Sequence, residues 1–121
     1  MPQMRETSLM SNLADRTCAA CAGAVAPLKG EALIHLAGEL GGDWRVLDEA
    51  RLEKVYKFKN FREALAFTNR VGEAAERENH HPDIELGWGR VKLVIWTHSV
   101  GGLTEADFVL AAKADQVLTP P

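Results

Sequence analysis

The sequence has no apolar run long enough to cross a membrane, and it has only two cysteines among its 121 residues. A membrane-spanning helix takes about 20 predominantly apolar residues, and a small disulfide scaffold takes several cysteine pairs. A strong charge of one sign is also absent, because 14 basic and 17 acidic side chains leave a formal charge of -3. These absences predict a single soluble, cytoplasmic domain that has no membrane partner and does not bind nucleic acid directly.

Motifs for nucleotide binding and for nucleophilic catalysis are missing as well. The glycines form neither a GxGxxG pattern nor a P-loop, no serine lies in a nucleophile elbow, and neither cysteine has a basic neighbour. Hydrophobic residues at 46% and charged residues at 26% are typical of an ordinary globular domain. Any chemistry therefore has to come from other residues.

Residues 1–27 show no helical or strand periodicity, and we interpret them as a flexible N-terminal arm. The arm carries Cys18 and Cys21 in a stretch of small residues, and we expect it to bury little area. Two reduced thiols are the favoured interpretation of this CxxC pair, with a zinc ion shared between subunits as the alternative. A thioredoxin-like motif is disfavoured, because that motif opens a helix after a strand.

Residues 28–121 alternate between helical and strand periodicity. The last helix has a capping-box signature, with Thr104 followed three positions later by Asp107. In chain order, the sequence predicts a helix at 28–40, strands at 43–48 and 51–59, a helix at 60–77, strands at 84–88 and 91–96, and a helix at 104–117. The order αββαββα predicts an α+β domain, in which a four-stranded, mostly antiparallel sheet has its helices packed on one face.

Three of the four histidines lie where predicted elements end. His80 and His81 follow the second helix, and His98 follows the last strand. If the last two strands pair as a hairpin about Gly89, all three histidines come to the same end of the sheet. Imidazoles act as acid or base near neutral pH without a metal, so the cluster predicts a site of proton transfer. Trp96 lies two residues before His98, on the same strand face, and is a candidate contact.

Two other interpretations of the histidines stay open. One is structural: His80 is a cation at a helix C-terminus, and the other two are exposed loop residues. The second is a zinc site, for which the spacing is unfavourable, because His80 and His81 are adjacent and point to opposite faces of an extended chain.

One spaced motif ties these residues together. Glu76 is followed after three positions by His80-His81-Pro82, after five more by Trp88, after nine more by His98, and later by Asp107. This pattern resembles the pterin-4a-carbinolamine dehydratases. The resemblance extends beyond the motif and covers roughly residues 28 to 118. It includes stretches such as Gly87-Trp88-Gly89-Arg90-Val91 and Gly101-Gly102-Leu103-Thr104.

The resemblance implies dehydration of a 4a-hydroxytetrahydropterin to quinonoid dihydropterin, with no metal, flavin or nicotinamide cofactor. By the same resemblance the catalytic residues are His80, His81 and His98, and the substrate-binding residues are Trp96, Thr97, Glu76, Pro82 and Asp107. Asp107 also has a purely structural interpretation as a capping residue, and Glu76 as a solvated helix residue. Which histidine is acid and which is base stays open.

The resemblance also implies partners. Family members form homodimers or homotetramers and serve the pathway of aromatic amino acid hydroxylases, whose pterin they recycle. Animal members also act as coactivators of a transcription factor, so a protein-binding role is an alternative. A dehydratase-like role in another pterin pathway, such as molybdopterin metabolism, is a further one.

Overall fold

A computed structural model of the chain describes residues 12–15 and 26–119. The predicted order αββαββα is confirmed, and each predicted boundary lies within about two residues of the one observed. The elements are α2 (Asn12–Asp15), α3 (Gly30–Leu40), β1 (Arg45–Leu47), β2 (Arg51–Lys57), α4 (Phe61–Glu78), β3 (Asp83–Gly87), β4 (Arg90–Ile95), the 3-10 turn η2 (His98–Val100) and α5 (Glu105–Gln116).

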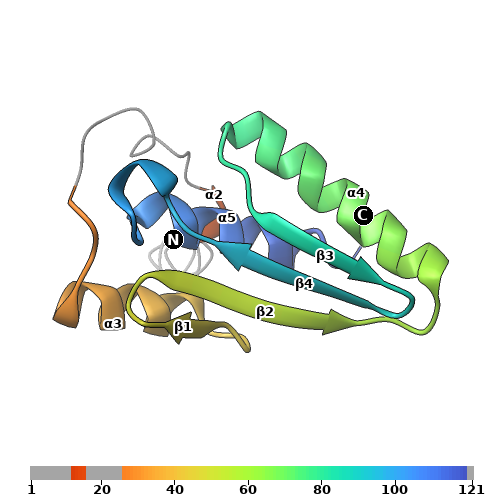
Figure 1. Ribbon diagram of the computed structural model, residues 1–121, viewed down its shortest axis with the longest axis horizontal. Helices are drawn as coiled ribbons and strands as arrows, with labels where there is room; N and C mark the ends of the chain where they lie inside the picture. The colour runs from red at the N-terminus through yellow and green to blue at the C-terminus, as the bar shows by residue number, and fades with distance from the viewer. Residues whose placement is uncertain (1–11, 16–25, 120–121) are drawn as a thin grey trace, which may run out of the picture.

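The four strands form one antiparallel sheet in the order β1-β2-β4-β3. Both predicted hairpins are present, and the long-range pairing of β2 with β4 joins them. The turn between β1 and β2 places Asp48 and Glu49 at positive φ, and the backbone N of Ala50 closes it by bonding to the carbonyl oxygen of Leu47 at 2.8 Å. In Figure 1 α5 lies behind the sheet, α4 runs alongside β3, and α3 lies near β1.

Strand alternation divides the sheet into a buried face and an open face. Leu52 pairs with Ile95 and Tyr56 with Val91, and all four side chains are buried toward the helices. Val55, on the opposite face of β2, is 41% exposed. The helices therefore pack on one face only, as the alternation predicted, and the ends of the strands and their connecting loops remain free to form a site.

Helix α4 begins at an Asn60 cap, whose side-chain oxygen accepts a hydrogen bond from the backbone N of Glu63 at 2.9 Å. Helix α5 is the central helix of the core, because seven of its 12 residues are buried, compared with five of 18 in α4. No helix in the described ranges has the length and apolar content that a membrane crossing requires.

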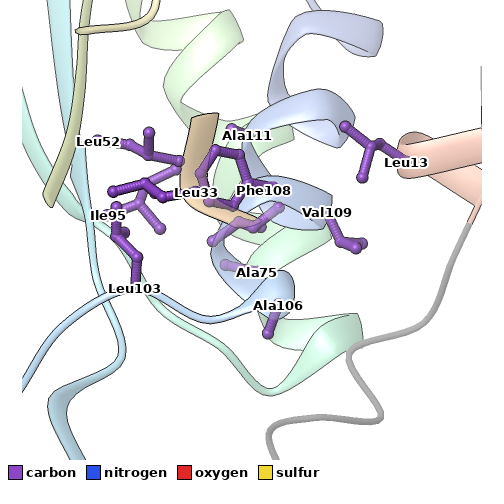
Figure 2. Packing of buried hydrophobic residues seen from close by; sticks show 11 residues of the cluster. Leu13, Leu33, Leu52, Ala75, Ile95, Leu103, Ala106, Phe108, Val109 and Ala111 are labelled. Carbon is purple, nitrogen blue, oxygen red and sulfur yellow. The ribbon is translucent and has the colours of Figure 1, made fainter. Parts of the chain in front are cut away.

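The expectation that the N-terminal arm buries little needs correction at Leu13. This side chain is 3% exposed and belongs to the larger core cluster. Figure 2 shows it on the Val109 side of α5, away from Leu52 and Ile95. The short helix α2 is also held by Lys113, whose Nζ donates to the carbonyl oxygen of Ala14 at 2.5 Å. One leucine and one lysine thus attach the arm to α5, which periodicity over so few residues did not indicate.

The two cysteines of the arm, Cys18 and Cys21, lie outside the described residues. The structure therefore leaves both interpretations of the CxxC pair as they stood.

Candidate active site

Two chain reversals bring the histidines to one end of the sheet. Helix α4 ends at Asn79, whose left-handed conformation (φ 53°) turns the chain, and the backbone N of His80 still bonds to the carbonyl oxygen of Ala75 at 3.1 Å. On the other side, β4 gives way to a closed loop in which Thr97 and Gly102 form an isolated bridge. Because β3 and β4 are antiparallel, the start of one lies beside the end of the other.

A cavity of about 210 Å³ opens between these two reversals. Its wall contains the three predicted catalytic histidines, so the structure brings them together as the hairpin argument predicted. The lining residues are Asn79, His80, His81, Trp96, Thr97, His98 and Ser99.

Of the predicted substrate-binding residues, Trp96 and Thr97 line this cavity, and the other three do not. Trp88, the aromatic residue of the motif, is 71% exposed at the β3-β4 turn, at the far end of the hairpin. Pro82 is outside the lining and only redirects the chain into β3. Glu76 and Asp107 are also outside it, but each bonds directly to a lining histidine.

His80 is the buried member of the cluster, with 8% of its surface exposed. Its Nε2 lies 2.6 Å from Oδ1 of Asp107, a side chain that is fully buried. The other carboxylate oxygen accepts hydrogen bonds from the hydroxyl of Thr97 at 2.7 Å and from the backbone N of Thr104 at 2.8 Å. A buried carboxylate held by this many hydrogen bonds fixes the orientation of the imidazole.

The capping interpretation of Asp107 is therefore correct but incomplete. The same carboxylate caps α5 through Thr104 and supports His80 through its other oxygen. The site sits on the N-terminus of the most buried helix, so the imidazole is held by the rigid core.

His81 is the exposed counterpart of His80. Its Nε2 lies 2.6 Å from Oε2 of Glu76, and the two side chains are 55% and 77% exposed. Solvent screens a pair of this kind, so it orients the ring more than it stabilises the fold.

His98 lies against an aromatic ring. Its imidazole is centred 4.3 Å from the Trp96 indole, and the guanidinium of Arg51 lies over the same indole at 4.9 Å. Both His98 and Arg51 are exposed. This side of the cavity therefore offers a flat aromatic surface with a cation above it, suited to a planar heterocycle.

Four residues near the site were not predicted. Asn79 and Ser99 are neighbours of predicted histidines and were identifiable by adjacency alone. Arg51 depends on the register of β2 against β4, which a single sequence does not reveal. Thr104 was recognised only as a cap, although its hydroxyl oxygen lies 2.9 Å from that of Thr97.

The two adjacent histidines diverge, as expected for an extended chain. One ring bonds to Asp107 in the core and the other to Glu76 on the surface. Within residues 12–15 and 26–119, no three His, Cys, Asp or Glu side chains are grouped so as to hold a metal ion. The arrangement suits proton transfer, since it combines three imidazoles, two of them paired with carboxylates, around one cavity.

Sequence comparison supplies relatives for this arrangement. The sequence profile described as "Pterin 4 alpha carbinolamine dehydratase" matches residues 26–117. A protein of Rubrobacter xylanophilus named "Putative pterin-4-alpha-carbinolamine dehydratase" is 56% identical over 108 residues, which cover 89% of this chain and 100% of the relative. A protein of the same name from Alkaliphilus metalliredigens is 45% identical, with coverage of 88% and 96%.

Solved structures agree with the fold. A transcriptional coactivator/pterin dehydratase from Brucella melitensis superposes with a TM-score of 0.68 at 28% identity, covering 75% of this chain and 98% of that one. A pterin dehydratase-like protein described as a RuBisCO assembly factor of the alpha-carboxysome has a TM-score of 0.57 at 21% identity, with coverage of 68% and 96%, and shows the fold alone. Since the family profile matches most of the chain, including all three clustered histidines, this protein belongs to the pterin 4 alpha carbinolamine dehydratase family.

Proposed function

We propose that this protein dehydrates a 4a-hydroxytetrahydropterin to quinonoid dihydropterin and water by acid/base catalysis at its histidines. The observation that carries the proposal is the cavity lined by His80, His81 and His98, in which one imidazole is fixed by the buried Asp107. The family name and the relatives support a dehydratase of this class.

The reaction needs two proton transfers and no change of oxidation state. The bond between C4a and its hydroxyl oxygen breaks as the lone pair of N5 forms the C4a–N5 double bond. The departing oxygen takes up one proton and leaves as water, while N5 gives its proton to a base. One imidazolium and one neutral imidazole supply these steps, each contributing about 10² to 10⁴ in rate.

We assign the base to His80. A base becomes positively charged as it accepts a proton, and only His80 among the three has a fully buried carboxylate at 2.6 Å to stabilise that charge. Because Nε2 is committed to Asp107, the proton from N5 goes to Nδ1. This nitrogen has no hydrogen-bond partner among the described residues and is not enclosed.

The acid is then one of the two exposed histidines. His81 is supported as an imidazolium by Glu76, and His98 by the face of Trp96. The indole of Trp96 gives the planar pterin a surface to pack against, so the substrate lies between the two sides of the cavity.

The test is turnover of 4a-hydroxytetrahydropterin, generated in situ by a hydroxylase, with the purified protein. We expect activity that survives EDTA, and at least a tenfold lower kcat for both His81→Ala and His98→Ala. His35→Ala is the matched control, because His35 is an exposed histidine of α3 paired with Glu39 at 3.9 Å, outside the cavity. Activity that EDTA abolishes and zinc restores, or an unchanged rate for His98→Ala, contradicts the proposal.

The physiological role that fits this reaction is cytoplasmic recycling of the pterin cofactor of aromatic amino acid hydroxylases, with tetrahydrobiopterin as the parent substrate. Comparing kcat/KM for biopterin and for pterins with other side chains tests this choice. A strong preference for another pterin favours the alternative pathway.

We also propose that the protein is a homodimer or homotetramer. Helix α4 exposes Phe61 by 44% and Leu65 by 40%, and both β1 and β3 are edge strands of the sheet. Light scattering at micromolar concentration is expected to give a multiple of the chain mass of 13.3 kDa. A mass equal to that of one chain refutes this assembly.

A protein-binding role is the second candidate, since the Brucella melitensis structure is described as a transcriptional coactivator as well as a pterin dehydratase. The two roles separate experimentally. Substituting Phe61 and Leu65 on α4 is expected to impair protein binding and to preserve the histidine cavity, which lies elsewhere.

A further inference from the structure

The carboxylate behind His80 belongs to a longer chain of polar groups. Oδ2 of Asp107 lies 2.7 Å from the hydroxyl oxygen of Thr97, which in turn lies 2.9 Å from that of Thr104. Asp107 is fully buried, and Thr97 and Thr104 are 7% and 2% exposed. Solvent has little access to these groups, so each hydrogen is placed by its protein neighbours.

The directions of these hydrogen bonds follow from counting hydrogens. An ionised carboxylate only accepts, so the single hydroxyl hydrogen of Thr97 points to Oδ2 of Asp107. The contact between the two hydroxyls is then donated by Thr104. The hydroxyl of Thr104 therefore donates to that of Thr97, and the hydroxyl of Thr97 donates to Oδ2 of Asp107. The other carboxylate oxygen, Oδ1, accepts the hydrogen on Nε2 of His80.

We propose that Thr104 is a positioning residue for His80, acting through Thr97 and Asp107. This inference rests on the proposed function, in which Nδ1 of His80 accepts the proton from N5. Thr104 never touches the cavity. It fixes which end of the imidazole carries the hydrogen.

The pair of His80 and Asp107 has two states that differ by one proton taken from solvent. With the carboxylate ionised and the hydrogen of the neutral imidazole on Nε2, Nδ1 has a free lone pair. When the pair takes up one more proton, one hydrogen lies on Asp107, the neutral imidazole carries the other on Nδ1, and Nδ1 then accepts no proton. Donors on Oδ2 favour the anion, and a hydroxyl that itself receives a hydrogen bond is a stronger donor. Thr104 therefore favours the arrangement that catalysis uses.

The kinetic test compares variants that keep shape and remove the hydroxyl. Thr104→Val is expected to lower kcat about tenfold, with KM within twofold, and Thr104→Ser to restore kcat within twofold. In a Thr97→Val background, Thr104→Val is expected to lower kcat less than twofold further, because the chain of donors is already broken. Independent effects that multiply, or a serine variant that fails to restore kcat, overturn the proposal.

Thr104 also caps α5, so a control for helix capping is needed. Asn60→Ala removes the side-chain cap of α4, far along the chain from the cavity residues, and is expected to lower Tm with kcat unchanged. An equal loss of kcat in Asn60→Ala assigns the effect to stability and overturns the proposal.

The decisive readout needs no substrate. Nitrogen-15 NMR of the His80 ring distinguishes Nδ1 with and without a hydrogen. We expect a bare Nδ1 in the neutral ring of the parent protein and an increased population of the Nδ1-protonated form in Thr104→Val. Thr97→Val is expected to give the same change, which keeps the test available if Thr104→Val fails to fold.

The two hypotheses fail separately. An unchanged His80 spectrum in both valine variants overturns the role of Thr104, even if kcat falls. A changed spectrum in a protein that never dehydrates the pterin supports the control of His80 by Thr104 and refutes the proposed function instead.

Discussion

Helix α5 carries two carboxylates that gather hydrogen-bond donors, one near each end. Asp107, in the first turn, is fully buried and accepts from an imidazole, a hydroxyl and a backbone N. Asp115, near the last turn, is partly buried and accepts from Lys54 at 2.8 Å, Tyr56 at 2.6 Å and the indole N of Trp44 at 3.0 Å. In both clusters an aspartate of α5 accepts the hydrogen bonds, and the clusters differ in the groups that donate them.

The donors decide what each carboxylate does. Lys54 forms an ion pair with Asp115 at 2.8 Å, and its Nζ lies 4.8 Å from the centre of the Tyr56 ring. Burial, the hydrogen bond to Asp115 and the charge of Asp115 all raise the pKa of Tyr56, so its hydroxyl keeps its hydrogen. The Asp115 cluster therefore holds β2 against α5 with every hydrogen fixed. The Asp107 cluster contains an imidazole, a side chain that can act as acid or base, and this imidazole faces a cavity.

The comparison predicts that replacing aspartate by asparagine lowers kcat at position 107 and lowers stability at position 115. Asp107→Asn is expected to lower kcat by about 10² to 10⁴, because the amide no longer stabilises a charged imidazole. Asp115→Asn is expected to leave kcat within about twofold and to lower the free energy of unfolding by about 1 to 3 kcal/mol. Steady-state kinetics and denaturant unfolding of both variants measure the two effects.

Each of the two variants is a control for the other, because the same substitution is made at two aspartates of the same helix, α5. Equal losses of kcat at the two positions would break the comparison, since Asp107 would then act only through the stability of α5.

The clustering of the three histidines was predictable from local signals. His80, His81 and His98 flank a hairpin whose turn is marked by Gly89, so alternation and antiparallel pairing were sufficient to bring them together. The support of His80 by Asp107 was harder to predict, since it joins residues 27 positions apart and the capping motif already explained Asp107. Because the capping motif accounted for Asp107, its second role as the partner of His80 could be recognised only from the packing of the folded chain.

The fold was predictable for a similar reason. Each helix and hairpin is local, and periodicity locates it. The placement of β4 between β2 and β3 was not, because it depends on which buried faces fit against each other. The docking of α2 was missed because a four-residue helix has no periodicity, and only the burial of Leu13 distinguishes it.

Leu13 gives the next largest expected effect and tests where the arm acts on α5. Ala14 and Asp115 share the wall of one cavity, whereas the arm contributes no described residue to the histidine cavity. Leu13→Ala is expected to lower the free energy of unfolding by about 2 to 3 kcal/mol, as loss of a buried leucine does, with kcat unchanged. Denaturant unfolding and turnover check this. A large loss of kcat would mean that the arm also acts on the Asp107 end.

Tyr56 gives the smallest expected effect at neutral pH and the sharpest test of the Asp115 cluster. Tyr56→Phe removes the 2.6 Å hydrogen bond to Asp115 and keeps the ring that packs on Phe67 at 4.5 Å. We expect the free energy of unfolding to fall by about 1 kcal/mol. Turnover should not change, because Tyr56 lies outside the histidine cavity.

The pH dependence of stability shows whether the Tyr56 hydroxyl keeps its hydrogen in the folded protein. The pKa of Tyr56 is raised in the folded state, whereas an unfolded tyrosine loses its proton near pH 10. Above that pH the unfolded state binds fewer protons than the folded state, so stability falls by about 1.4 kcal/mol per pH unit from this group. Denaturant unfolding at pH 9 and at pH 11 is expected to show this slope in the parent protein and a smaller slope in Tyr56→Phe. Lys54 and the other titratable groups are present in both proteins, so the difference between their slopes isolates the tyrosine. Equal slopes would mean that Tyr56 ionises in the folded state as readily as in the unfolded one, and that the Asp115 cluster exchanges protons after all.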